Sequence, residues 1–144
     1  MHKTILLTGA LMLCAGCGSV RKHTINPPGA DRLAPYSTAV RSGNLVFLSG
    51  VIGRKPGVTA LPEGTEAQTQ QALENLRANL TAAGLAPADV VKCTVFLVDI
   101  ADYAVMNRVY GQFFPQDPPA RSALAVAALP ANARVEIECI AAAR

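Results

Sequence analysis

Apolar residues recur along the chain with two spacings, one typical of strands and one typical of helices. Alternation with polar residues, or a β-branched run bounded by turn residues, predicts a strand. In the last such segment Arg134, Glu136 and Glu138 stand at every second position, so one face of that strand is polar. The predicted strands are a hairpin over 37–49, a run over 90–98 that suits a strand buried on both faces, and two final strands over 122–126 and 133–141.

The helical spacing occurs in two segments. In the first, apolar residues three and four positions apart predict an amphipathic helix over about 66–83. Its start carries a capping-box pattern, in which the Thr65 hydroxyl accepts from the Gln68 backbone and the Gln68 side chain reaches back. The apolar positions are Leu73, Leu76, Leu80 and Ala83.

The second helix is expected between a capping aspartate, Asp99 or Asp102, and the helix-ending Pro115. Large apolar and aromatic residues form one stripe along it, which is typical of a face buried in the core. The stripe consists of Tyr103, Met106, Tyr110 and Phe113.

The predicted order of elements is ββαβαββ, which indicates an α+β domain with two helices on one face of a mixed sheet. A chain of 144 residues has the length of one domain. The other face of the sheet then lies in water or is covered by other subunits, and self-association is a natural way to cover it.

Charge and histidine content exclude several classes of function. The chain has 13 Lys and Arg against 10 Asp and Glu, a balance far short of the basic surface that nucleic-acid binding needs. Its two histidines, His2 and His23, precede the first segment predicted to fold. Ser-His-Asp triads, Cys-His pairs and His-ligated zinc are therefore excluded.

Residues 1–17 have the order of a secretory signal: a basic start, an apolar run and small residues. The end of this segment resembles a bacterial lipoprotein box, which predicts a signal peptide over 1–16, a lipidated Cys17, a tether over 17–32 and a folded domain over 33–144. The expected location is the cell envelope, on the periplasmic face of the outer membrane. An ordinary secreted signal and a misassigned start codon are the alternatives.

Cys93 and Cys139 both fall in apolar strand patterns. An export compartment would allow them to pair, but spacing along the chain does not place their Cα atoms within bridging distance. We therefore expect two separate buried thiols.

Three polar residues stand where the predicted elements would hold them rigidly: Tyr36 before the hairpin, Arg121 at the start of a strand and Glu136 inside the last strand. The pattern alone is equally consistent with a surface ion pair at Arg121 and a solvated carboxylate at Glu136.

Several sequence motifs favour functional roles for these residues. The stretch PARS over 119–122, followed by VEIE over 135–138, resembles the C-terminal signature of the RidA (YjgF-like) reactive intermediate deaminase family. APY over 34–36, GNLVFLSG over 43–50, AGL over 83–85 and VKCTVFLVD over 91–99 also match, so the resemblance covers 33–144 in order.

The resemblance implies a chorismate-mutase-like fold, homotrimers with a small-molecule cleft at each subunit interface, and hydrolysis of enamines and imines such as 2-aminoacrylate to 2-keto acids and ammonia. It implies no cofactor and no metal. Arg121 would hold the substrate carboxylate, Glu136 would move protons to and from the attacking water and the leaving nitrogen, and Tyr36 would line the pocket.

Five further positions are implied to contact the substrate: Gly50, Val51, Asn107, Ser122 and Ala123. Two of them depart from the family, because Val51 stands where many members have Gln and Ala123 where well-studied deaminases have Cys. Both changes make the pocket less polar. The alternative function is a non-catalytic envelope lipoprotein that binds small carboxylates in the same clefts, and RNA cleavage is disfavoured by the near-neutral charge.

Overall fold

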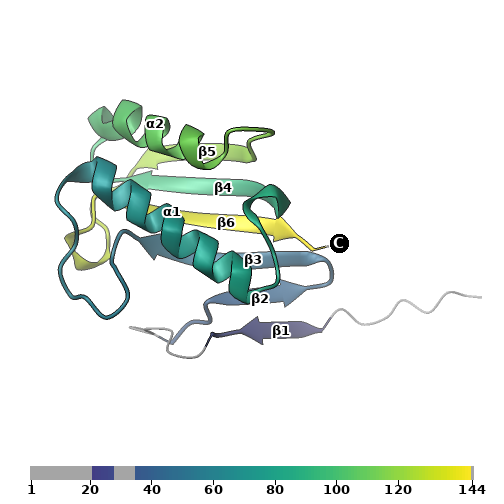
Figure 1. Cartoon of the computed structure of the whole chain (residues 1–144). Coiled ribbons are helices and arrows are strands. Elements are labelled where there is room, and N and C mark those ends of the chain that lie inside the picture. Colours follow the sequence, from purple (N-terminus) through teal and green to yellow (C-terminus); the bar gives the residue numbers. More distant parts are fainter. Residues whose placement is uncertain (1–20, 28–34, 144) are drawn as a thin grey trace, which may run out of the picture.

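A six-stranded sheet with both helices on one of its faces forms the body of the protein (Figure 1). The computed structural model describes residues 21–27 and 35–143. The strands lie in the order β1-β2-β3-β6-β4-β5, with β4 and β5 parallel and the other neighbours antiparallel. The elements are β1 (Lys22–Ile25), β2 (Ala39–Ser42), β3 (Leu45–Ile52), α1 (Gly64–Ala82), β4 (Val90–Leu97), α2 (Tyr103–Phe113), β5 (Ala120–Ala125) and β6 (Val135–Ala142).

From β2 onward the elements follow the predicted ββαβαββ order, and the α+β class with two helices on one face is confirmed. The strand β1 was not predicted. Residues 22–25 were expected to belong to a tether, but they pair antiparallel with β2, from Lys22 opposite Ser42 to Ile25 opposite Ala39. This strand lies exposed at the edge of the sheet, so its residues are mostly charged or polar. They therefore show no apolar alternation from which a strand could be predicted.

The hydrophobic core lies between the helices and the sheet. The predicted leucine face of α1 is fully buried there, and Met106 and Tyr110 of α2 extend it. Burying a leucine side chain contributes roughly 1.5–3 kcal/mol, so this layer is the main source of stability. The predicted core stripe of α2 holds only in part, because the Tyr103 side chain is 41% exposed.

The opposite face of the sheet is open. On β4, Lys92, Thr94 and Phe96 alternate with the buried Cys93, Val95 and Leu97 and are half-exposed. The expectation that this strand is buried on both faces is therefore wrong for the single chain. Three large apolar side chains on this open face are also exposed, namely Leu45 and Phe47 on β3 and Leu124 on β5.

The predicted capping box at the start of α1 does not form. The helix begins at Gly64, one residue before Thr65, and no side chain caps it. The Thr65 hydroxyl instead donates to the Asp102 carboxylate, which also accepts from Arg134 Nη2 at 2.7 Å. Gln68 likewise reaches outward, because its Oε1 accepts from the Arg134 backbone N–H at 2.8 Å. These contacts join the starts of α1, α2 and β6.

Cys93 and Cys139 form a disulfide, so the expectation of two separate thiols is wrong. They lie directly opposite each other on the neighbouring strands β4 and β6. This register brings their Cα atoms to 4.1 Å despite a separation of 46 residues along the chain. Only the pairing of the strands, which spacing along the chain does not show, determines that distance.

Candidate active site

Arg121 lies on β5, the strand at one edge of the sheet, and its side chain points to the face that carries α2. Its Nη2 donates to the Asn107 side-chain oxygen at 2.6 Å and to the Tyr103 hydroxyl at 3.0 Å. Tyr103 and Asn107 are four residues apart on α2, so both present their polar groups on one side of the helix. The guanidinium is thus held in a fixed orientation at the surface.

The aromatic ring of Tyr110 lies one helical turn further along and supports the same guanidinium. The Arg121 Cζ atom stands 4.5 Å from the ring centroid, within the range of a cation–π interaction. Tyr110 is 4% exposed, and its buried hydroxyl has no hydrogen-bond partner in the described part of the chain. Burial raises the pKa of Tyr110 to about 12, so this phenol stays neutral beside the arginine.

Glu136 lies on β6 with its carboxylate beside Gly50 of β3. A β-carbon at position 50 would overlap the Glu136 side chain, so the glycine there makes room for this carboxylate. The implied contact of Gly50 with the substrate stays a prediction. Partial burial, and then repulsion from Glu138, raise the pKa of Glu136 above its ordinary value.

Tyr36 precedes a segment that is hydrogen-bonded to β3 next to Gly50. Ser49, next to Gly50, holds the segment that follows Tyr36: its hydroxyl donates to the Ser37 carbonyl at 2.7 Å and its N–H donates to the Thr38 carbonyl at 3.1 Å. Tyr36 is 46% exposed, so its ring and hydroxyl are available at the surface.

The predicted site residues therefore form two half-sites, which lie on opposite faces of one sheet. Arg121 faces α2, where it meets Asn107. Glu136 alternates along β6 with the buried Val135 and Ile137, so it points to the open face. One chain does not bring the arginine and the glutamate together. We call the Arg121, Asn107 and Tyr103 group the arginine half-site, and the Tyr36, Ser49, Gly50 and Glu136 group the glutamate half-site.

The remaining predicted contacts divide between the two faces. Ala123 packs partly against the core on the side of Arg121. Ser122 points to the open face, where its hydroxyl accepts from Lys92 Nζ at 2.7 Å. Val51 lies opposite Ile137 and packs against the core, so its side chain points to the face that carries the helices.

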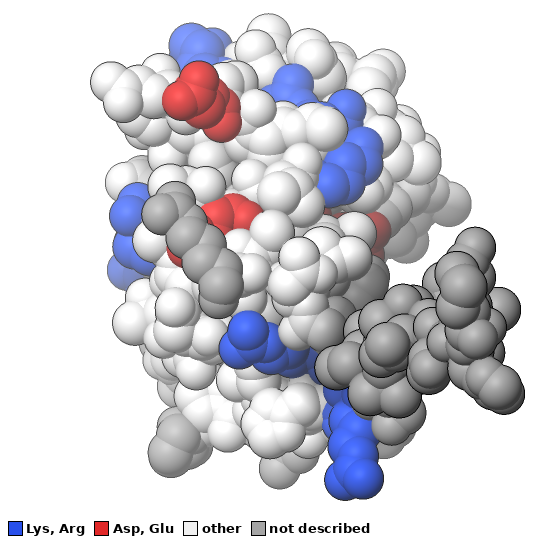
Figure 2. Space-filling view, turned by 90° about the vertical axis from the view of Figure 1, so that its right-hand side faces the viewer, with Lys and Arg blue, Asp and Glu red and all other residues white. Residues whose placement is uncertain are grey.

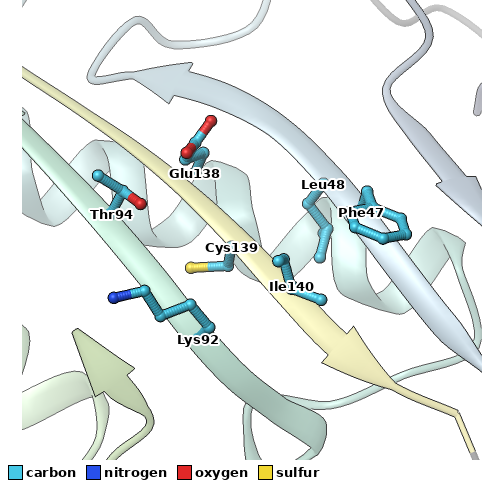
Figure 3. A pocket seen from close by; sticks show the side chains of 7 residues that line it. All are labelled: Phe47, Leu48, Lys92, Thr94, Glu138, Cys139 and Ile140. Atoms are coloured by element: carbon cyan, nitrogen blue, oxygen red, sulfur yellow. The ribbon is translucent and has the colours of Figure 1, made fainter. Parts of the chain in front are cut away.

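A shallow hollow on the open face contains none of the predicted site residues (Figure 3). In the figure the helices lie behind the strands that carry its lining. That lining consists of Phe47, Leu48, Lys92, Thr94, Glu138, Cys139 and Ile140. A position on the middle of a sheet face that has no helix suits contact with another subunit better than it suits a reaction site.

Two polar residues of the half-sites did not emerge from the sequence. Tyr103 was assigned to the core because it falls in the apolar stripe of its helix. The four-residue spacing to Asn107 was the available signal that the two side chains share a face. Ser49 has no such signal, because its role depends on pairing within the hairpin.

The surface charge shows no concentrated basic patch in the view of Figure 2, where Lys and Arg side chains occur at separate places with uncharged atoms between them. That distribution agrees with the small net charge of +3 and gives no support to nucleic-acid binding. In residues 21–27 and 35–143 no helix is both long and apolar enough to cross a membrane.

Fold and side chains together define a small α+β protein with an arginine half-site and a carboxylate half-site. Residues 27–143 match the family model described as endoribonuclease L-PSP. Reactive Intermediate Deaminase A of Arabidopsis thaliana, a chloroplastic protein, is 45% identical over 131 residues, which cover 90% of this chain and 70% of the relative. A RutC family protein of Drosophila melanogaster is 46% identical over 123 residues, covering 85% of this chain and 89% of the relative.

Solved structures of similar proteins have the same fold. The crystal structure of Escherichia coli TdcF with bound serine superimposes with a TM-score of 0.80 at 38% identity, covering 85% of this chain and 99% of that one. The chain belongs to the family of the reactive intermediate deaminases, and the membership predicted from the sequence motifs is confirmed.

The predicted envelope location is wrong. Relatives that match most of this chain include a chloroplastic plant protein and an insect protein. The family is therefore not restricted to the bacterial outer membrane. The signal peptide over 1–16 and the lipidated Cys17 lie outside the residues that the structure describes. The alternative of a carboxylate-binding envelope lipoprotein finds no support among these relatives.

Proposed function

We propose that this protein hydrolyses reactive enamines and imines of the 2-aminoacrylate and 2-imino acid type, in clefts where the arginine half-site of one subunit meets the glutamate half-site of another. The relative named as a reactive intermediate deaminase supports the enzyme class predicted from sequence. The separation of Arg121 and Glu136 onto opposite faces is the observation that supports a site shared by two chains.

Arg121 anchors the substrate carboxylate. A guanidinium offers a planar fork of donors that matches two carboxylate oxygens, and Asn107 and Tyr110 hold this one in place before a ligand arrives. Anchoring an imino acid in one orientation converts its reaction with a nearby water into an effectively intramolecular step.

Glu136 carries out the proton transfers. Its carboxylate takes a proton from water as the water oxygen bonds to the C=N carbon, and the proton then passes to the nitrogen. The carboxylate then takes the proton of the hydroxyl group that has formed and passes it to the same nitrogen as the C–N bond breaks. Ammonia leaves and a C=O bond remains, so imine and water give keto acid and ammonia. A carboxyl group with a raised pKa suits both directions of transfer near neutral pH. Tyr36 donates a hydrogen bond near the nitrogen.

A homotrimer supplies the second chain. The open face of the sheet exposes the large apolar side chains of Leu45, Phe47 and Leu124, which contact with another subunit would cover. Closed cyclic assembly repeats one interface around a ring, so every cleft receives one half-site from each of two neighbours. The catalytic domain in this assembly extends from β1 to β6.

Mixing two inactive variants tests the shared site. Arg121→Ala removes the anchor, and Glu136→Gln removes the proton-transfer group while keeping its shape. If each cleft takes its arginine and its glutamate from different chains, random mixed trimers restore up to about a quarter of the native clefts. The readout is the rate of decay of 2-iminopropionate, generated by an amino-acid oxidase, in the presence of the full chain.

Each variant alone is expected to give no acceleration, and the unfolded and refolded mixture is expected to regain activity. A mixture as inactive as its parents would place both groups of one cleft on a single chain. Acceleration by Arg121→Ala alone at the wild-type rate would remove the deaminase proposal itself.

A further inference from the structure

We propose that the Tyr103 hydroxyl is a second ligand for the substrate carboxylate, donating a hydrogen bond beside the Arg121 guanidinium. The proposal rests on the carboxylate-anchoring role of Arg121 proposed above. It assigns Tyr103 a part in selecting substrates that carry a carboxylate over otherwise similar neutral molecules.

The direction of the hydrogen bond between the two residues is the first observation. Arg121 has donors only, so in the 3.0 Å contact its Nη2 donates and the Tyr103 oxygen accepts. The phenolic proton is therefore not used in this contact. Within the described part of the chain it has no acceptor, and it remains available to a ligand.

The second observation is that the Arg121 Nη2 atom is already occupied. Its two protons point to the Tyr103 oxygen and to Asn107 Oδ1, which lies at 2.6 Å. Both forked binding modes of a guanidinium use a donor at Nη2, together with one at Nε or at Nη1, so an incoming carboxylate must share or displace one of these contacts. A carboxylate that displaces the tyrosine oxygen from Nη2 meets the free phenolic proton in the same place.

The exposure of the side chain is the third observation. Tyr103 is 41% exposed and stands at the rim of the arginine half-site, whereas Tyr110, under the same guanidinium, is 4% exposed. Both rings lie near the arginine, at 5.6 Å and 4.5 Å from its Cζ. Only the Tyr103 hydroxyl can reach a ligand, because the Tyr110 hydroxyl is buried.

Two variants that each remove one exposed hydroxyl group form a matched pair for the test. Tyr103→Phe removes the hydroxyl beside Arg121 and keeps the ring, and Thr81→Val removes a hydroxyl on α1 that donates to the Arg77 carbonyl and belongs to neither half-site. Arg121→Ala removes the anchor. For each full-length variant, calorimetry measures the dissociation constants of serine, which has a carboxylate, and of serinamide, which does not.

A hydrogen bond to a charged group predicts that Tyr103→Phe weakens serine binding about tenfold. Serinamide binding is expected to change less than about twofold, and Thr81→Val is expected to change the binding of both ligands less than about twofold. A purely structural effect of Tyr103 would weaken both ligands alike, and that result would overturn the proposal.

The experiment distinguishes the role of Tyr103 from the role of Arg121. Wild-type affinity of Tyr103→Phe for serine, combined with loss of serine binding in Arg121→Ala, would overturn the role of Tyr103 and leave that of Arg121 intact. Unchanged serine binding in Arg121→Ala would overturn both roles, as would a wild-type protein that binds serine no more tightly than serinamide.

Discussion

The carboxylate of Glu136 occupies the space that a β-carbon would fill at Gly50. An ideal β-carbon built there would lie 2.9 Å from Cδ and 3.2 Å from Cγ of Glu136, and closer still to Oε1. The glycine is not required for an unusual backbone angle, since position 50 is not among the residues with positive φ. Glycine is required at this position because any side chain on β3 would overlap the carboxylate that Glu136 of β6 places there.

Gly50→Ala is therefore expected to affect the reaction more than the fold. The atoms it meets belong to the far part of a flexible side chain, so Glu136 can turn aside at a cost on the order of 1 kcal/mol. The carboxylate then leaves its position, and kcat for imine hydrolysis should fall on the order of a hundredfold. Steady-state kinetics and thermal unfolding measure the two effects separately.

Gly111→Ala is the matched control for this prediction. Gly111 lies in α2 with no atom near the place of its β-carbon. Because alanine is the better helix former, this variant should be equally active and up to about 1 kcal/mol more stable. A fall of kcat in both variants would count against the specific role of Gly50.

The sequence predicts the layers of this fold well, because buried faces leave a period that can be read. Leu73, Leu76 and Leu80 mark the inner face of α1, and the alternation around Glu136 marks the open face of β6. What depends on pairing between strands could not be predicted. The disulfide of Cys93 with Cys139 needs the register of β4 with β6, and that register leaves no local pattern.

The same limit applies to the site. Family motifs identified Arg121 and Glu136, but only the assembled sheet shows that they face opposite sides. Tyr103 was predicted to lie in the core because its spacing fits the apolar stripe, but it stands at the edge of that stripe and its side chain is exposed. Strand β1 was missed because an exposed edge strand does not need apolar residues.

Glu138→Gln should move the acidic limb of the pH–rate profile to lower pH. Burial and then the charge of Glu138 raise the pKa of Glu136. Glu136 must be ionised to take a proton from water, so kcat/KM falls as the pH drops below this pKa. Removing the neighbouring charge lowers the pKa, and the active form persists to lower pH.

The shift is partial in this variant, because burial is the larger cause and remains. Profiles of kcat/KM from about pH 4 to pH 9, which include the ordinary carboxyl pKa and the range above it, measure this shift. Glu74→Gln, an exposed change on α1, should leave the profile in place. An acidic limb that does not move in Glu138→Gln would mean that another group controls it.

Reduction of the Cys93–Cys139 disulfide should destabilise the protein. The two residues are separated by 46 positions, and closing a loop of that size is worth about 4 kcal/mol in the chain-entropy account. Urea unfolding with and without a thiol reductant measures the difference, and peptide mapping by mass spectrometry should recover the two cysteines in one linked species. The double variant C93A/C139A provides the control, since the reductant should not change the urea midpoint of its unfolding. Equal urea midpoints for the wild type with and without the reductant would contradict a stabilising disulfide.

A charge on the open face should separate the subunits and abolish activity together. Phe47 is 43% exposed on β3, so Phe47→Glu removes little packing within the chain and places a carboxylate in the proposed interface. Burying that charge without a partner costs several kcal/mol, enough to dissociate the trimer at micromolar concentration. Light scattering should give the mass of one chain with unchanged circular dichroism, and imine hydrolysis should be lost because no cleft receives both half-sites.

Thr81→Glu adds the same charge on the outer side of α1 and should remain trimeric and active. Activity in a monomeric Phe47→Glu would show that one chain suffices for the reaction.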